Sequence, residues 1–357
     1  MSLADRLKAE IAAQGPMTVA EYMARCLFDP RDGYYATRPA LGEDGDFITA
    51  PLVSQMFGEL IGLWSVEAWR RLGAPATFRL VEMGPGDGTL MVDALRAARL
   101  DPAFMTAADL WLVEASAPLR ERQAAALAGA PIQPRWTGSL AEVPADAPLV
   151  LVANELLDCL PARQFLRTAE GWAERMVGLS PGGALAFGLK PSAPPLAAPA
   201  DLEPGVVWEA SPAQEALGAE IGALVCADGG CALLIDYGRA EPGPGDTLQA
   251  LSRHLKVDPL ETPGEADLTV WADFPAVLAA ARQAGASTAI ATQGEFLRRL
   301  GIETRAAALM RARPDLAAVI ERQLLRLTGP GQMGSLFKAA AVWSPLDARP
   351  PAFEEPS

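Results

Sequence analysis

The segment that decides the fold is residues 78–90, FRLVEMGPGDGTL, where an apolar run leads through an acid and three spaced glycines into a new pattern. The apolar start is typical of a buried strand, and the residues from Leu90 onward have the spacing of a helix. Gly84, Gly86 and Gly88 allow a tight turn between the two and a close approach to a ligand. Strand, glycine turn and helix N-terminus together predict a ligand site, the alternative being a glycine-rich turn without a ligand.

The acid before the turn, Glu82, indicates the class of cofactor. Dinucleotide-binding folds prefer G-x-G-x-x-G, with the pyrophosphate at the helix N-terminus, whereas this run is E-x-G-x-G-x-G. A carboxylate there repels a pyrophosphate and attracts an ammonium group. S-adenosyl-L-methionine carries an ammonium and a sulfonium and has no phosphate, so the charge pattern favours this cofactor. A second acid, Glu114, closes the apolar run 109–114; we expect it to bind ribose hydroxyls, the alternative being a solvated strand-end acid.

Composition excludes several classes of function. The chain has 357 residues, an apolar fraction of 50% and a net charge of −14. That charge argues against nucleic-acid binding and suits a basic peptide or a guanidinium substrate. The four cysteines lack C-x-x-C spacing and His254 is the one histidine, so we expect no metal site and no Ser-His-Asp or Cys-His chemistry. No apolar stretch approaches the length of a membrane span.

The first residues bear on the location of the protein. Residues 1–13 are typical of an amphipathic helix with both signs of charge. They lack the basic start and apolar run of a signal peptide, and they are too acidic for a typical transit peptide. We therefore expect a bacterial cytoplasmic protein with reduced thiols rather than a mitochondrial one.

A helical region and a long loop precede the glycine turn. The residues from Thr18 to Glu21 form a capping box, which predicts a helix from Thr18 to about Leu27. Residues 33–51 then mix glycines, aromatic residues and acids, Asp46 among them, and this composition favours a functional lid over a disordered insertion. Helical spacing returns from 54 to 71. We expect residues 1–72 to form an N-terminal helical region with this lid loop.

A second pair of acids follows the apolar run 148–153. Glu155 and Asp158 are three residues apart, so they could lie on one face of a helical turn. Together they could clamp a guanidinium through charge-assisted hydrogen bonds. The alternative is that they complement the dipole at a helix start. The preceding loop, with Ser139 and Leu140, is expected beside an adenine ring.

The remainder predicts further elements around a core from 73 to 343. Three short runs between 164 and 189 predict an antiparallel meander, and 230–238 predicts another buried strand. The excursion 239–271, which carries His254, is expected to be an ordinary loop, and 333–343 an edge strand. We place insertions at about 162–205 and 239–290, and a frayed tail at 344–357.

Six motifs resemble those of the MidA family of class I S-adenosylmethionine-dependent methyltransferases, which includes mitochondrial assembly factors of respiratory complex I. They are residues 33–35 (GYY), 45–51 (GDFITAP), 57–59 (FGE), 82–90 (EMGPGDGTL), 154–158 (NELLD) and 236–238 (DYG). The resemblance implies a Rossmann-like α/β fold, with a mostly parallel sheet, helices on both faces and a substrate-side insertion. It also implies arginine methylation of a protein partner, in mitochondrial members a hydrophilic complex I subunit.

The motifs and the resemblance together give a set of candidate site residues. The catalytic candidates are Glu155, Asp158 and Asp46. The candidate cofactor-binding residues are Glu82, Gly84, Pro85, Gly86, Gly88, Glu114, Ala115, Ser139, Leu140, Asn154, Thr49 and Pro51. Two other functions stay open: a non-catalytic assembly or binding protein that keeps the fold, and an NAD-binding oxidoreductase, which the glycine spacing and Glu82 oppose.

Overall fold

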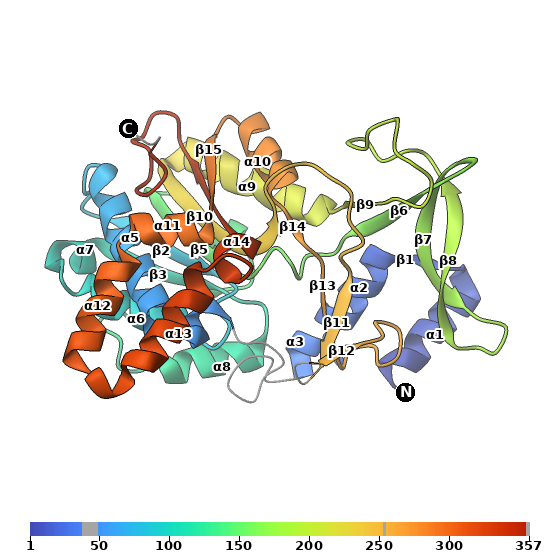
Figure 1. Cartoon of the computed structure of the whole chain (residues 1–357), viewed down its shortest axis with the longest axis horizontal. Coiled ribbons are helices and arrows are strands. Elements are labelled where there is room, and N and C mark those ends of the chain that lie inside the picture. The colour runs from blue at the N-terminus through green and yellow to red at the C-terminus, as the bar shows by residue number, and fades with distance from the viewer. Residues whose placement is uncertain (38–48, 253–254, 355–357) are drawn as a thin grey trace.

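The computed structural model describes residues 1–37, 49–252 and 255–354. Asp46, most of the expected lid loop and His254 lie outside the described residues. Figure 1 shows an elongated molecule, with a central sheet and its helices at one end and the N-terminal helices with several antiparallel strands at the other. Within the described residues, no helix is long and apolar enough to cross a bilayer.

A mostly parallel sheet forms the centre of the molecule. In the described chain it has eight strands, ordered β15-β16-β10-β5-β2-β3-β4, with β14 paired to the end of β10. β16 runs antiparallel to both of its neighbours. The strands are β2 (Phe78–Met83), β3 (Ala108–Val113), β4 (Arg135–Thr137), β5 (Leu149–Asn154), β10 (Gly230–Arg239), β14 (Ala272–Asp273), β15 (Ser287–Thr292) and β16 (Phe337–Trp343). This arrangement confirms the expected Rossmann-like α/β fold.

Helices cover both faces of this sheet, because alternate residues of each buried strand point to opposite sides. Two separate apolar clusters result, one on each face. The helices on one face are α5 (Gln55–Arg71), α6 (Thr89–Ala98), α7 (Pro102–Ala107), α11 (Gln293–Arg299), α12 (Ile302–Ala312), α13 (Ala317–Thr328) and α14 (Met333–Leu336). The opposite face carries the helices α9 (Pro212–Asp228) and α10 (Phe274–Gln283) and the short 3-10 turn η1 (Leu140–Glu142).

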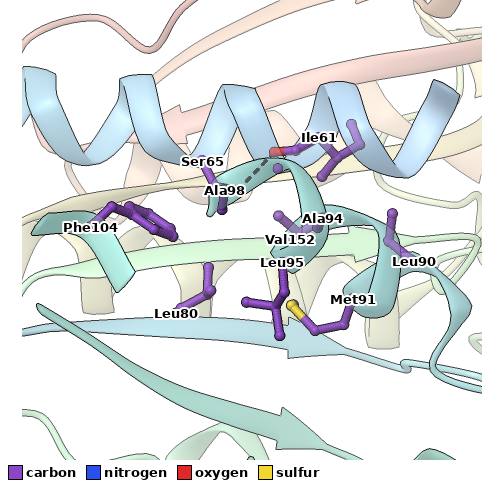
Figure 2. Close-up of a pocket in the computed structure, with 11 residues that line it drawn as sticks. Ile61, Ser65, Leu80, Leu90, Met91, Ala94, Leu95, Ala98, Phe104 and Val152 are labelled. Atoms are coloured by element: carbon purple, nitrogen blue, oxygen red, sulfur yellow. Dashed lines mark hydrogen bonds between the residues drawn. The ribbon is translucent and has the colours of Figure 1, made fainter. Parts of the chain in front are cut away.

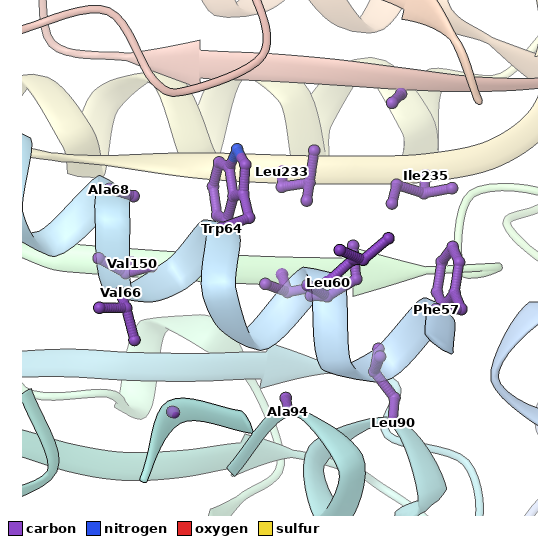
Figure 3. Packing of buried hydrophobic residues seen from close by; sticks show 14 of the residues in the cluster. Phe57, Leu60, Trp64, Val66, Ala68, Leu90, Ala94, Val150, Leu233 and Ile235 are labelled. Atoms are coloured by element: carbon purple, nitrogen blue, oxygen red, sulfur yellow. The ribbon is translucent and has the colours of Figure 1, made fainter. Parts of the chain in front are cut away.

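Helix α5 lies directly on the sheet. Figure 3 shows Leu60 and Trp64 pointing from α5 toward the strands, with Leu233 of β10 among the residues they face. Trp64 is fully buried, and its indole N–H donates to the carbonyl of Pro351 at 3.1 Å. Burying a side chain of this size contributes about 2–3 kcal/mol to stability. Helix α5 is therefore a main part of the core, although it lies before the glycine turn in the sequence.

The contact between α5 and α6 is unusually close. A Cβ added at Gly62 would come within 2.2 Å of the Ala94 carbonyl oxygen, so a larger residue there would force the helices apart. In Figure 2 the Ser65 hydroxyl donates to the Ile61 carbonyl beside this contact, at 2.9 Å. The apolar void seen there encloses about 10 Å³, which is about one water-sized volume and too little for a cofactor.

The N-terminal helices pack with a second, antiparallel sheet. The capping box at Thr18 is present and starts α2, as predicted. The sheet contains the expected meander and two further strands, one paired with the first strand of the meander and one with its second strand. The helices are α1 (Leu3–Gln14), α2 (Val19–Phe28) and α3 (Tyr34–Thr37), and the strands are β1 (Met17–Thr18), β6 (Arg163–Thr168), β7 (Gly171–Leu179), β8 (Leu185–Ser192) and β9 (Val207–Ala210).

The excursion after β10 is not the ordinary loop that its glycines and prolines predicted. It contains a three-stranded sheet ordered β12-β11-β13, made of β11 (Gln249–Ser252), β12 (Leu255–Val257) and β13 (Asp267–Thr269). Ala250 and Leu268 are buried in one cluster with Tyr22 of α2. The Tyr22 hydroxyl also donates to the Pro259 carbonyl at 2.6 Å. Packing on the N-terminal helices therefore orders a segment that has weak local preferences.

Two further expectations are wrong. β16 is an interior strand, because β15, which was not predicted, pairs along its outer side from Ser287 to Thr292. The described part of the tail is not frayed. Phe353 is buried, and its ring lies 5.4 Å from that of Phe296 on α11.

Candidate active site

The glycine turn has the predicted form of strand, turn and helix. β2 ends at Met83, and Gly84, Gly86 and Gly88 have φ values of +62°, +58° and +88°. This left-handed region favours glycine, because a Cβ would clash with the following carbonyl. Gly88 is also the residue from which α6 begins. At Gly84 a Cβ would in addition lie 2.9 Å from the Leu156 side chain, so the turn is closely covered from the side of β5.

Glu82 is buried immediately beneath this turn. Only 2% of the residue is exposed, and burial, with the nearby Asp87 charge, raises the pKa of Glu82 to about 8. Its Oε2 atom is buried and has no hydrogen-bond partner in the described chain. An unsatisfied buried carboxylate oxygen is costly, so this atom indicates a site where a ligand donor is missing.

Glu114 follows β3 and is held by a network that includes the glycine turn. Its Oε1 accepts from the Ser116 N–H at 2.8 Å, and its Oε2 accepts from the Gln123 side chain at 3.2 Å. The same Gln123 amide N–H donates to the Gly86 carbonyl at 2.9 Å, and the Gln123 side-chain oxygen accepts from the Trp136 indole N–H at 2.9 Å. Gln123 on α8 (Ala117–Ala126) therefore fixes the two strand ends relative to each other. Sequence reasoning missed it, although a glutamine in an alanine-rich helix was a weak indication.

These strand ends open into a cavity of about 430 Å³, within the range of small-molecule sites. Seven candidates from the sequence line it together: Thr49, Gly84, Gly86, Glu114, Ala115, Glu155 and Asp158. The other lining residues are Leu27, Phe28, Pro30, Tyr35, Ala36, Ser116, Ala117, Pro118, Leu119, Leu156, Cys159 and Asp267. The cavity thus joins the core, the N-terminal helices and the excursion after β10.

Glu82, beneath the turn, and six other described candidates lie around the cavity without lining it. Pro85 and Gly88 close the turn through an N–H···O bond of 2.9 Å. Ser139 donates to Glu142, and Leu140 is buried in the core under the sheet. Two more candidates flank the lining residues: Asn154 ends β5, and Pro51 is buried in α4 (Ala50–Val53). Their roles at a cofactor stay predictions.

Glu155 combines an unusual backbone with a long-range contact. Its φ is +53°, one of the three positive values at non-glycine residues in the described chain. Its N–H donates to the carbonyl of Ile235 at 2.8 Å. Its Oε1 accepts from the N–H of Ala50, the first residue of α4, at 2.9 Å. Burial raises the pKa of Glu155 to about 7 despite this donor. The carboxylate therefore holds the segment that begins at Thr49 against the end of β5.

Asp158 is held by a buried acid on the neighbouring strand. Asp236 is fully buried, and its carboxylate accepts from the N–H groups of Leu157, Asp158 and Tyr237 at 2.8, 3.1 and 2.8 Å. These bonds fix the turn after β5. Burial raises the pKa of Asp158 to about 7, and the nearby Tyr237 hydroxyl opposes this rise.

The substrate-side wall is acidic. Cys159 and Asp267 lie beside Asp158 on it, and sequence reasoning missed both, because neither belongs to a recognisable pattern. Among the described residues, Asp158 has no basic side chain within ion-pair distance, whereas the charge of Arg326 acts on Glu155 and opposes the rise of its pKa. No group of His, Cys, Asp and Glu in the described chain has the arrangement of a metal site. Buried carboxylates without a protein counter-charge favour a cationic, hydrogen-bonding ligand.

Comparison with known proteins identifies the family. A family model described as "Putative S-adenosyl-L-methionine-dependent methyltransferase" matches residues 60–292. The chain belongs to this methyltransferase family. The human protein named Protein arginine methyltransferase NDUFAF7, mitochondrial, is 35% identical to the methyltransferase over 94% of this chain and 82% of its own length. The Xenopus tropicalis protein of the same name is 33% identical over 96% and 85%.

A solved structure agrees with these relatives. A Burkholderia thailandensis crystal structure bound to S-adenosyl-homocysteine is 30% identical, with a TM-score of 0.85, and covers 99% of this chain and 94% of its own. The methyltransferase therefore uses S-adenosyl-L-methionine, as the charge of the glycine turn predicted. The expected cytoplasmic location is contradicted, because the curated relatives are named as mitochondrial proteins.

Proposed function

We propose that the methyltransferase transfers a methyl group from S-adenosyl-L-methionine to an arginine side chain of a protein. Two independent observations support this substrate. The curated relatives are named protein arginine methyltransferases. The wall of the cavity beside the glycine turn also carries the buried carboxyl of Asp158, which has no basic side chain of the described residues within ion-pair distance, and such a group suits a guanidinium substrate. This acidic wall carries the proposal.

The residues at the core end of the cavity fit the cofactor. The unpartnered oxygen of Glu82 is suited to the ammonium of the methionine end, and Gly84 and Gly86 present backbone without a side chain to the cavity. Glu114, oriented by Ser116 and Gln123, is suited to the ribose hydroxyls. When bound, the cofactor supplies an electrophilic methyl group on a sulfonium.

The protein must then position the acceptor nitrogen and take up one proton. A guanidinium is protonated and a poor nucleophile, so carboxylates that draw its positive charge away from the attacking nitrogen assist the transfer. Asp158 is placed for this role in the cavity wall, and the bond from its N–H to the Asp236 carboxylate fixes its backbone. With a pKa of about 7, Asp158 can also accept the proton that the methylated guanidinium group releases. Glu155 adds negative charge and positions Thr49.

For the target protein we infer a subunit of respiratory complex I. The support is the resemblance of the motifs at 45–51 and 154–158 to those of the MidA family, whose mitochondrial members act on such a subunit. The test is mass spectrometry of complex I purified from cells with and without this gene. Loss of a methylarginine from a hydrophilic subunit on deletion is the expected result, and an unchanged methylation pattern would disprove the target.

The chemical function is tested with labelled S-adenosyl-L-methionine and protein extract from cells that lack the gene. We expect label in methylarginine after acid hydrolysis, and at least a hundredfold lower rate with Asp158→Asn. Glu261→Gln, which removes an exposed acid from the excursion, is the matched control and should keep the rate. If the protein binds S-adenosyl-homocysteine but labels no arginine, the proposal fails and a binding or assembly role, or another acceptor, replaces it.

A further inference from the structure

Tyr35 contacts both halves of the cavity. Its backbone carbonyl accepts from the Ser116 hydroxyl at 2.7 Å, and the Ser116 N–H in turn donates to the Glu114 carboxylate. Its own hydroxyl donates to Asp267 Oδ1 at 3.2 Å, with Oδ2 at 3.4 Å. One residue of α3 therefore connects the residues beside β3 to the first residue of β13.

The Tyr35 ring has little freedom to move away from this position. It stacks on Phe28 of α2 at 5.8 Å between centroids, and it meets the buried Tyr34 ring edge-on at 5.2 Å. Gly33, which precedes them, packs so closely on the Asp29 backbone that a Cβ would come within 2.5 Å. The phenol oxygen is thus a fixed donor rather than a mobile surface group.

Asp267 is fixed from its other side by the backbone. β13 pairs with β11, where Leu251 lies opposite Asp267, and the Val270 N–H donates to the Asp158 carbonyl at 2.9 Å. Asp267 and Asp158 are both only 7% exposed, and both line the cavity. Asp267 accepts a hydrogen bond from the Tyr35 hydroxyl, and the Tyr237 hydroxyl is close enough to Asp158 to oppose the rise of its pKa. The Gln249 amide donates to the Tyr237 oxygen at 3.5 Å.

We propose that Asp267 is a second carboxylate for the acceptor guanidinium, acting with Asp158, and that Tyr35 sets its orientation relative to the ribose end of the site. This inference rests on the proposed function, since it assigns residues to the same acceptor. A planar guanidinium offers five N–H donors, so two fixed carboxylates can each take a pair and determine which nitrogen stays open to the methyl group. The excursion after β10 thereby becomes a part of the acceptor site.

The test compares Asp267→Asn, Tyr35→Phe and Glu261→Gln with the wild type in the extract assay. Tyr35→Phe keeps the ring contacts and the carbonyl but removes the hydroxyl. We expect Asp267→Asn to raise the extract concentration for half-maximal rate at least tenfold, and Tyr35→Phe about threefold. Binding of S-adenosyl-homocysteine, measured by calorimetry, should stay within twofold in all three proteins. That measurement also shows that each variant is folded.

The outcomes separate this inference from the proposed function. If the wild type labels no arginine, the proposed function and the inference fail together. If the wild type is active but Asp267→Asn and Tyr35→Phe reach half-maximal rate at the same extract concentration as Glu261→Gln, only the inference fails. If both variants lose cofactor binding as well, the two residues maintain the cofactor end of the fold, and the assignment to the acceptor is wrong.

Discussion

The Glu155 carboxylate accepts a hydrogen bond from the Ala50 N–H at 2.9 Å, across 105 residues of the chain. Glu155 itself has φ +53°, a strained value for a residue with a side chain. This pair ties the start of α4, and with it Thr49 at the cavity, to the end of β5. The strained backbone of Glu155 therefore holds its carboxylate against the start of α4, next to the cavity-lining residue Thr49.

Substitution of Glu155 separates its positioning role from its charge. Glu155→Ala leaves the Ala50 N–H without its acceptor, so we expect a loss of about 1–3 kcal/mol of stability. We also expect at least a twentyfold fall in turnover, with S-adenosyl-homocysteine binding unchanged. Glu155→Gln keeps an acceptor oxygen and should stay within fivefold of the wild-type rate. Equal rates for Ala and wild type would remove Glu155 from the site, and a Gln variant as inactive as Ala would show that the charge itself is needed.

Glu114 is expected to decide the affinity for the cofactor. Glu114→Ala removes the proposed acceptor for the ribose hydroxyls and leaves the Ser116 N–H without this acceptor, so the Kd for S-adenosyl-homocysteine should rise at least tenfold, equivalent to about 1.4 kcal/mol. Calorimetry measures this directly. Glu121→Gln, an exposed change on the same helix as Gln123, should leave the Kd as it is. An unchanged Kd in Glu114→Ala would refute the ribose assignment.

Glu82 should make stability depend on pH. Its pKa is raised from 4.5 to about 8 in the folded protein, so the folded state holds the proton longer than the unfolded chain does. The contribution of Glu82 to the free energy of unfolding is fully present below pH 4.5 and is lost as the pH rises to about 8. Over this range the free energy of unfolding falls by about 1.4 kcal/mol per pH unit. In Glu82→Gln this loss is absent. The free energy of unfolding of the variant should therefore rise relative to that of the ligand-free wild type as the pH rises.

Urea unfolding between pH 5 and pH 8.5 measures this difference. Glu155 and Asp158 titrate over part of the same range, so the comparison must be between variant and wild type at each pH. Glu121→Gln again serves as the exposed control. Parallel curves for Glu82→Gln and wild type would mean that Glu82 is ionised throughout and has a partner in the folded protein.

The sequence predicted the parts of the site that depend on neighbours along the chain. Apolar runs that end in acids placed Glu82 and Glu114 at strand ends, and the glycine spacing predicted both the turn and the cofactor. The contacts across the cavity were not predictable in this way. Tyr35 and Asp267 are 232 residues apart, and their meeting depends on a three-stranded sheet whose local sequence resembles a loop.

The central sheet also has strands that the local sequence predicts and strands that depend on distant contacts. Interior strands such as β5 are continuous apolar runs, because both of their faces are buried. β15 has six residues like β5 but is only partly buried along its length, so it had no such pattern, and without it β16 resembled an edge strand. The order of strands comes from pairing between distant segments. Local periodicity carries little information about such pairing.

The glycine turn provides the last prediction, because its geometry and its surroundings can be tested separately. Gly84 and Gly73 both have positive φ, +62° and +86°, but a Cβ would meet the Leu156 side chain only at Gly84. Gly73→Ala should therefore show the backbone strain alone, about 1 kcal/mol of lost stability with the Kd for S-adenosyl-homocysteine unchanged. Gly84→Ala adds a methyl group where the cofactor is expected to approach the backbone, so its Kd should rise at least tenfold. Equal affinities in the two variants would show that the turn shapes the protein without forming the binding surface.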